Sequence, residues 1–339
     1  MTNLFGITKS DLESYFLGIQ EKKFKATQVY EWLYQKRVFD IDGFSNIKKE
    51  VREQLKSDFD MTFIKIEKKQ EDDLTVKYLF RLSDGEAIEA VVMMHDYGTS
   101  ICVSSQVGCN MGCRFCESGR LKKVRNLETY EMVEQILLAE KDLGKRISSV
   151  VIMGIGEPLD NYDNVINFIK IINDAKGIAI GARHITLSTC GLVPKIYELS
   201  QLPIQINLAI SFHAPTDELR SKLMPVNKVY SIDALIKAIR DYLQVTSRRV
   251  TIEYVMLNNV NDSIECARLL AHLFKGMNIY VNLIPYNETN HLEFSRSSKT
   301  KIREFYDTLK KEGINVTIRK EFGANIDAAC GQLRGREIR

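Results

Sequence analysis

The sequence predicts an α/β protein built around a full or partial barrel of parallel strands. From about residue 99, short apolar segments alternate with amphipathic segments of helical period. Six or seven such pairs occur, and repeated β-α units form parallel sheets joined by right-handed crossovers. Two other patterns precede them. They divide the chain into a small helical domain at 1–60, a short antiparallel β extension at 61–98 and the barrel at 99–339.

The helical domain is predicted from apolar residues spaced three and four positions apart. Ser10 and Ser45 precede two of these segments and are expected to be N-caps. The extension that follows is rich in Val, Ile, Phe and Tyr and alternates in polarity, which is typical of strands. Its turn is expected at residues 83–85, Ser-Asp-Gly.

The barrel strands are predicted from short apolar runs between helical segments such as 126–143 and 231–243. Ligand sites of parallel barrels lie at the C-terminal ends of the strands, so these ends are where functional residues are expected. The candidate strands are 100–105, 148–154, 184–189, 206–212, 250–256, 280–286 and 315–320.

Composition limits the class of protein further. The chain has 339 residues, of which 45% are hydrophobic and 27% charged, an ordinary globular balance. It contains no apolar run of the roughly 18 residues that a membrane span needs, and it begins with no secretory signal pattern. We therefore expect a cytoplasmic monomer with no membrane partner. The seven cysteines are odd in number and three are clustered, which favours metal or redox chemistry over a disulfide framework.

Three cysteines, Cys109, Cys113 and Cys116, follow the first barrel strand with the spacing C-x3-C-x2-C. Zinc would need a fourth ligand, and the paired C-x2-C knuckles of structural zinc sites are absent. A four-iron cluster held by three thiolates would leave one iron open to a small molecule. With Phe115 before the third cysteine, the motif resembles the signature of radical S-adenosylmethionine (SAM) enzymes, in which SAM binds the open iron.

Polar residues also follow the later strands of the predicted barrel. The run "MGIGEP" after the second strand resembles the motif that binds the SAM amino group in these enzymes. Residues with short polar side chains recur at the C-terminal ends of the predicted strands. One polar cofactor bound there explains this recurrence better than a separate turn or cap at each strand end. The candidate SAM-binding residues are Gly156, Glu157, Ser188, Ser211, Phe212, His213 and Asn287.

The order of motifs resembles one family closely, the RlmN/Cfr family of radical SAM RNA adenine methyltransferases. The matching stretches include "ICVSSQVGCNMGCRFC", "VVIMGIGEPLDN", "RHITLST", "ISFHAP", "LMPVN", "NLIPYN" and "NIDAACGQL", across residues 86–335. The resemblance implies a partial (β/α)6 barrel, a helical domain that contacts RNA, a 4Fe-4S cluster and two SAM molecules per turnover. It also implies a reducing electron donor such as flavodoxin.

The resemblance assigns three further residues. Cys330 matches the cysteine that carries the methyl group, Cys102 matches its partner in a transient disulfide, and Glu89 matches a glutamate near the substrate base. The implied reaction is methylation of adenine C2 in 23S rRNA at the peptidyl-transferase centre, and of an adenine in a tRNA anticodon loop. Cys190 and Cys266 match no family role and are interpreted as structural.

Three alternatives remain open from the sequence. Cfr-type enzymes methylate C8 of the rRNA adenine and confer antibiotic resistance, although "GIGEPL" and "IEYVMLNNVND" resemble the C2 branch more. A non-catalytic iron–sulfur RNA-binding protein would not need Cys330, and a radical SAM enzyme for protein or small molecules would not explain "DAACGQL".

Residues 114–125 contain five basic residues and one acid, which predicts contact with RNA phosphates beside the cluster.

Overall fold

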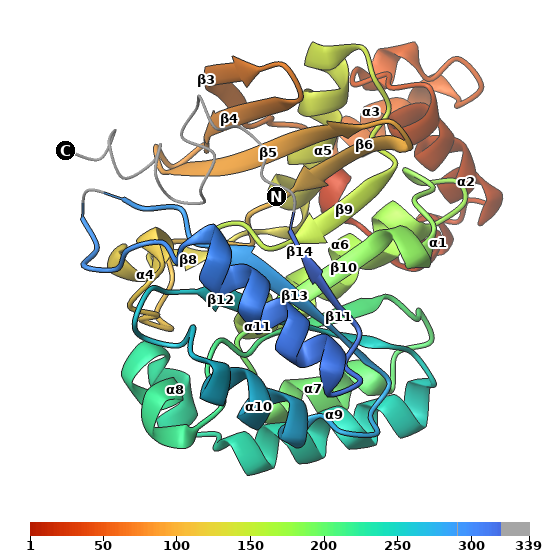
Figure 1. Ribbon diagram of the computed structural model, residues 1–339. Coiled ribbons are helices and arrows are strands. Elements are labelled where there is room, and N and C mark those ends of the chain that lie inside the picture. Colours follow the sequence, from red (N-terminus) through yellow and green to blue (C-terminus); the bar gives the residue numbers. More distant parts are fainter. Residues whose placement is uncertain (290, 320–339) are drawn as a thin grey trace.

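The computed structural model describes residues 1–289 and 291–319. Cys330 and the "DAACGQL" motif therefore lie outside the described residues. Figure 1 shows a strongly curved sheet with helices on its outer side and the N-terminal helices packed at one end. No helix in the described part of the chain is long and apolar enough to cross a membrane.

One sheet runs through the described chain and contains both predicted sheet regions. The strands from β14 to β6 in the order below are parallel, and β5, β4 and β3 continue the sheet in antiparallel fashion. This arrangement confirms the predicted α/β class with a partial barrel. The order is β14 (Val316–Ile318), β13 (Ile279–Pro285), β12 (Val250–Met256), β11 (Asn207–Ser211), β10 (Ile185–Thr189), β9 (Ser149–Ile152), β6 (Gly98–Cys102), β5 (Ala87–His95), β4 (Thr75–Arg81) and β3 (Lys65–Asp72).

Amphipathic helices connect the parallel strands and cover the outside of the sheet (Figure 1). The helix α5 begins with a capping box, in which the Glu131 carboxylate accepts a hydrogen bond from the Glu128 N–H (2.8 Å). It ends at Gly144, whose positive φ of 60° suits a helix C-terminus. The helices are α5 (Thr129–Leu143), α6 (Tyr162–Asn173), α7 (Val193–Ser200), α8 (Asp217–Leu223), α9 (Ile232–Thr246), α10 (Ile264–Leu273) and α11 (Lys299–Lys311).

The N-terminal helices begin at other residues than the sequence predicted. Thr8, not Ser10, is the N-cap of the first helix, and its hydroxyl accepts a hydrogen bond from the Asp11 N–H. The third helix begins at Lys49 rather than after Ser45, because the chain first makes a turn that buries Ile47. The helices are α1 (Lys9–Gly18), α2 (Phe24–Tyr30), which continues as a π-helical turn at Glu31–Gln35, and α3 (Lys49–Asp58).

The register of β5 and β6 determines which side chains face the barrel interior. Cys102 lies opposite Val91, and Ile101 lies opposite Val92. Because side chains alternate along a strand, one pair faces one side of the sheet and the other pair the opposite side. Ile101 and Val92 belong to the main hydrophobic core, whereas Cys102 and Val91 line a cavity.

Candidate active site

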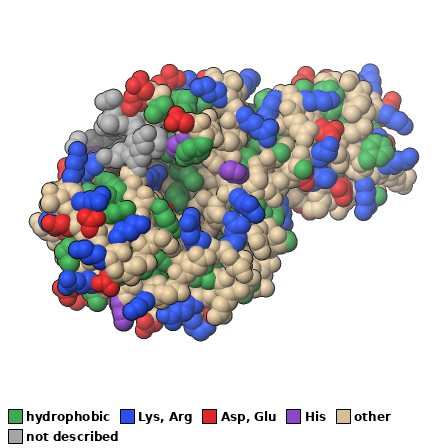
Figure 2. Space-filling model, turned by 45° about the vertical axis from the view of Figure 1, so that its right-hand side comes forward, with side chains coloured by type: hydrophobic (Ala, Val, Ile, Leu, Met, Phe, Trp, Pro, Cys, Tyr) green, Lys and Arg blue, Asp and Glu red, His purple; other side chains and the backbone are tan. Residues whose placement is uncertain are grey.

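A cavity of about 370 Å³ lies at the C-terminal ends of the parallel strands. The molecule is visibly hollowed in Figure 2, with hydrophobic side chains inside the hollow and Lys and Arg side chains around it. The structure brings ten of the predicted site residues into the wall of this one cavity: Cys102, Cys109, Cys113, Cys116, Gly156, Glu157, Ser188, Ser211, His213 and Asn287.

The loop that carries the three clustered cysteines is fixed by backbone hydrogen bonds. The Cys109 N–H donates to the Leu121 carbonyl, and the Arg114 N–H donates to the Leu223 carbonyl at the end of α8, each at 2.9 Å. Gly108 has a φ of 80°, and a Cβ there would lie 2.1 Å from the Lys122 carbonyl oxygen. Only glycine fits this position, so the loop conformation depends on it.

The three thiols suit a cluster better than a single ion. Burial raises the pKa of Cys109 to about 12 and the pKa of Cys113 well above its usual range, so metal coordination is what would keep them as thiolates. In the described chain, no three His, Cys, Asp or Glu side chains converge as the ligands of one metal ion would. A 4Fe-4S cluster binds each thiolate to a different iron, so it does not require such convergence. Three thiolate donors would fit such a cluster.

Glu157 is buried and anchors two loops at the cavity wall. Its carboxylate accepts hydrogen bonds from the Leu159 N–H (3.0 Å) and the Cys190 N–H (2.8 Å). Burial raises the pKa of Glu157, and these hydrogen bonds oppose that shift. Gly156 lies against Gln106, where a Cβ would approach the Gln106 Cβ to 2.6 Å. The close packing against Gln106 is thus a second reason for a glycine in the "GIGEP" turn. Cys190, which was interpreted from the sequence as structural, also lines the cavity.

The residues after β11 point in different directions. The buried His213 lines the cavity, accepts a hydrogen bond at Nδ1 from the Val255 N–H (3.0 Å) and contacts Phe115 edge-on. Burial lowers the pKa of His213 to about 3, so the imidazole is neutral near pH 7. Phe212, predicted to bind SAM, instead packs in the core against Phe274 and is absent from the cavity lining of the described residues.

Arg220 on α8 is a buried cation that sequence analysis missed. Its guanidinium donates to the carbonyls of Cys190 (2.7 Å), Phe212 (3.1 Å) and Ser211 (3.2 Å), and to Asn227 Oδ1 (3.0 Å). These bonds tie the segments after β10 and β11 together beside the cysteine loop. The only signal in the sequence was that Arg220 lies on the apolar side of a short helix, next to Leu219 and three residues before Leu223.

Glu89 lies on β5 in a buried ion pair. Its carboxylate is 2.9 Å from Lys77 Nζ on β4, and the side chains are 3% and 0% exposed. Among the described residues, Val91 and Met93 line the cavity and Glu89 does not. Glu89 lies on the same face of the sheet as these two residues, because side chains alternate along a strand.

Glu253 on β12 is a second buried acid, also missed from the sequence. It lines the cavity and accepts a hydrogen bond from Asn282 Nδ2 (2.8 Å). The signal that singled out Glu89, an acid within an apolar strand, is also present in "VTIEYVM".

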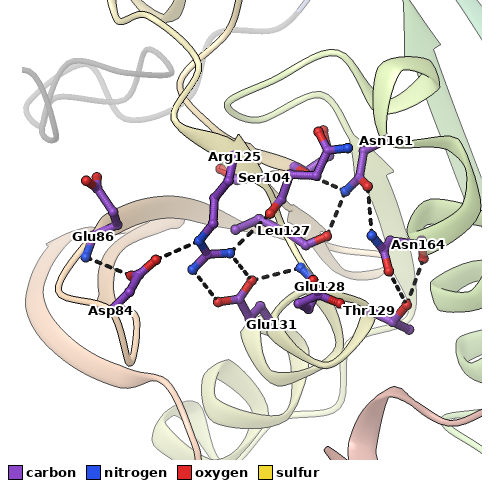
Figure 3. Close-up of polar contacts among 12 residues, drawn as sticks. Asp84, Glu86, Ser104, Arg125, Leu127, Glu128, Thr129, Glu131, Asn161 and Asn164 are labelled. Atoms are coloured by element: carbon purple, nitrogen blue, oxygen red, sulfur yellow. Dashed lines mark hydrogen bonds and ion pairs between the residues drawn. The ribbon is translucent and has the colours of Figure 1, made fainter. Parts of the chain in front are cut away.

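Acids neutralise most of the basic stretch 114–125, and all of these acids except Glu117 come from elsewhere in the chain. Arg125 lies between Asp84 and Glu131 (Figure 3), and the other pairs are Lys123 with Asp160, Arg120 with Glu117, and Arg114 with Glu293. Of the five basic residues, only the exposed Lys122 makes no ion pair within the described residues. The charge excess in the sequence therefore overstates the surface charge of this stretch.

Known proteins with similar sequences and structures identify the class of enzyme. The family model of the Radical SAM superfamily matches residues 103–270, and that of the ribosomal RNA large subunit methyltransferase N-terminal domain matches residues 2–61. A crystal structure of a radical SAM methyltransferase from Sphaerobacter thermophilus has a TM-score of 0.92 and 40% identity, over 98% of this chain and 99% of that chain. The fold and the cysteine loop define a radical SAM enzyme, a class that uses a 4Fe-4S cluster and SAM.

Relatives over the full length specify the family. A probable dual-specificity RNA methyltransferase RlmN from Spiroplasma citri is 50% identical over 99% of this chain and 98% of the relative. The protein of that name from Enterococcus faecalis is 52% identical over 99% and 97%. The chain belongs to the RlmN family of radical SAM RNA methyltransferases.

Proposed function

We propose that the chain methylates C2 of an adenine in 23S rRNA at the peptidyl-transferase centre, and an adenine in a tRNA anticodon loop. The observation that carries this proposal is the single cavity that contains the three clustered thiols, Cys102 and the polar strand ends. The full-length relatives named as dual-specificity RNA methyltransferases support the RNA substrates. The helical residues 1–60 are proposed to contact the RNA.

The cofactors explain how an aromatic carbon becomes reactive. When bound, the cluster and SAM supply the one-electron reductive chemistry that direct methyl transfer from SAM to adenine C2 lacks. We propose Cys109, Cys113 and Cys116 as the cluster ligands, and two SAM molecules per turnover, with electrons from a flavodoxin-type donor. The SAM site is proposed at Gly156, Glu157, Ser188, Ser211, His213 and Asn287, with Phe212 acting only through its backbone.

Cys330 and Cys102 are proposed to carry the methyl group and to release the product. A thiolate at Cys330 is a suitable nucleophile for the SAM methyl group. Arg319 lines the cavity, and Cys330 follows eleven residues later, a length that spans at most about 40 Å. We propose that Cys330 meets Cys102, which lines the cavity, and that a transient disulfide between them frees the methylated RNA.

Glu89 is the proposed proton acceptor. When a methyl group is added at C2, the hydrogen already on that carbon must leave, and a positioned carboxylate can take it as a proton. The Lys77 ammonium lies 2.9 Å from the Glu89 carboxylate and is its buried charge partner. The side chain lies on the same sheet face as the cavity residues of β5.

Nucleoside analysis tests the proposed function. The anaerobically reconstituted protein is incubated with SAM, a reductant and an rRNA fragment, and the digested RNA is analysed by mass spectrometry. We expect 2-methyladenosine. If 8-methyladenosine were the main product, the chain would belong with the C8 enzymes, and no methylated adenosine would favour the non-catalytic RNA-binding alternative.

A further inference from the structure

Five buried polar side-chain atoms on the cavity wall have no hydrogen-bond partner among the described residues. Four of them lie in two short segments: the Oε1 atom of Glu117, the hydroxyls of Ser118 and Tyr286, and Oγ1 of Thr289. Buried polar atoms without a partner are rare because their desolvation is costly. The fifth atom, Thr75 Oγ1, also lines the cavity but comes from β4. Such a concentration on one wall indicates a ligand that supplies the missing bonds.

Four of the unpartnered atoms come from two segments that meet beside the cysteine loop. Glu117 and Ser118 directly follow Cys116, and Tyr286 and Thr289 flank Asn287 after β13. Burial raises the pKa of Tyr286 to about 12, and the nearby Thr289 side chain opposes this shift. The Tyr286 and Thr289 hydroxyls are thus neighbours, although their geometry does not make a hydrogen bond between them. Arg120 binds the other Glu117 oxygen at 3.1 Å. This leaves one carboxylate oxygen as an acceptor and one phenol O–H as a donor.

Around these polar atoms the wall is apolar. Phe115, Met224 and Val255 line the cavity and pack in the same small hydrophobic cluster as Tyr286, and Phe294 lies edge-on to the Tyr286 ring. A flat apolar ligand with a donor and an acceptor on one edge would satisfy this arrangement. The amino edge of adenine has that pattern, because its exocyclic amine donates and the neighbouring ring nitrogen accepts.

We propose that Glu117 and Tyr286 form an adenine-recognition subsite, in which Glu117 Oε1 accepts from the exocyclic amine and the Tyr286 O–H donates to the adjacent ring nitrogen. This assignment rests on the proposed function, which brings two adenines to the cavity, one in SAM and one in the RNA. Hypoxanthine places a carbonyl where adenine has its amine, so its oxygen would face the Glu117 carboxylate. The subsite therefore selects adenine over hypoxanthine.

The test measures this selection directly, by binding rather than turnover. The cluster-loaded full-length chain is titrated with SAM or its hypoxanthine analogue, and separately with rRNA fragments that carry adenosine or inosine at the target position. In one of the two comparisons we expect the unaltered chain to prefer adenine by about tenfold or more. Glu117→Gln keeps the shape of the side chain, but its amide can donate as well as accept. The preference should therefore fall to about twofold or less.

A second variant tests the subsite without altering the charge. Tyr286→Phe removes only the hydroxyl and should weaken adenine binding about fivefold or more in the same comparison. Tyr230→Phe is the matched control, because Tyr230 packs on the same hydrophobic cluster but does not line the cavity. It should leave both affinities unchanged.

The outcomes separate the two sources of adenine. A loss of preference with the SAM pair assigns the subsite to the cofactor, and a loss with the RNA pair assigns it to the target base. Unchanged preference in both comparisons for Glu117→Gln, or unchanged affinity for Tyr286→Phe, would overturn the proposal. Because SAM binding requires no RNA methylation, a failure of the proposed function would be seen separately, in the nucleoside analysis.

Discussion

At the scale of single residues, the buried pair of Lys77 and Glu89 combines a structural cost with a proposed catalytic role. Both side chains are almost completely buried, and charges removed from water are tolerated only when they are paired. The register places Leu79 opposite Glu89, so Lys77 reaches the carboxylate diagonally from the neighbouring strand. The pair holds a charged carboxylate inside the sheet.

Removal of one partner should be worse than removal of both. Lys77→Met leaves the Glu89 charge buried without its cation and should lower the free energy of unfolding by about 3 kcal/mol. The double variant Lys77→Met with Glu89→Gln should recover much of that loss, as measured by urea denaturation. The exposed pair of Lys222 and Glu218 is the control, and Lys222→Met should cost less than about 1 kcal/mol. Equal losses in the single and double variants would contradict this account.

Residues with a local pattern could be predicted from the sequence, whereas those with distant partners could not. The cysteine loop and Glu157 are marked by spacing within a few positions of a strand end, and both are in the cavity wall. Lys123 and Arg125 looked available to RNA because their acidic partners, Asp160 and Asp84, are 37 and 41 positions away. Pairing over such separations depends on the fold and leaves no sequence pattern.

At the scale of elements, α5 joins the end of the N-terminal region to the barrel. Glu134 on this helix is fully buried, and one carboxylate oxygen accepts a hydrogen bond from the Ile64 N–H at 2.8 Å. The other oxygen has no hydrogen-bond partner in the part of the chain that the structure describes. Burial therefore raises the pKa of Glu134 to about 9, so the folded protein keeps this carboxyl protonated at neutral pH.

The protonation of Glu134 predicts a pH dependence of stability. An unfolded glutamate ionises near pH 4.5, whereas the folded one stays protonated up to about pH 9. Between these pH values the folded state therefore binds more protons than the unfolded state. The contribution of Glu134 to stability falls as the pH rises, by up to about 1.4 kcal/mol per pH unit. Glu134→Gln removes this effect. Its stability relative to the unaltered chain should increase from pH 5 to pH 8 in denaturant titrations, and a constant difference would contradict the assignment.

The positions of the strands were easier to predict than the starts of the helices. Each parallel strand overlaps its predicted range, because a buried strand requires a continuous apolar run. The sequence marks the start of a helix less clearly than it marks a buried strand. Thr8 and Ser10, for example, are both suitable N-cap residues and lie only two positions apart. Asp11 resolves the choice, because its N–H donates to the Thr8 hydroxyl and its carboxylate accepts from the same group.

At the scale of the whole molecule, the barrel has two edges with different surroundings. The C-terminal edge carries the cavity, the cysteine loop and the exposed Lys122, and the opposite edge carries the ends of the outer helices. Lys275 follows α10 at that opposite edge and is also exposed. RNA that reaches the cavity would therefore pass Lys122 and not Lys275.

This difference predicts unequal effects of charge reversal. Lys122→Glu should weaken RNA binding and reduce the slope of log affinity against log salt concentration by about one, as expected when a phosphate contact is lost. Lys275→Glu should leave both quantities nearly unchanged. Fluorescence anisotropy with a labelled rRNA fragment at several salt concentrations measures both variants. Equal effects would show that only the net charge matters.

The central claim is that this cavity transfers a methyl group to adenine through Cys330. The most direct test compares RNA methylation by the reconstituted chain with that by Cys330→Ala, using Cys266→Ala as a control because Cys266 lies on α10 and does not line the cavity. We expect 2-methyladenosine from the unaltered chain and from Cys266→Ala, and no methylated adenosine from Cys330→Ala with a full cluster content. Methylated RNA from Cys330→Ala would contradict the proposed role of Cys330.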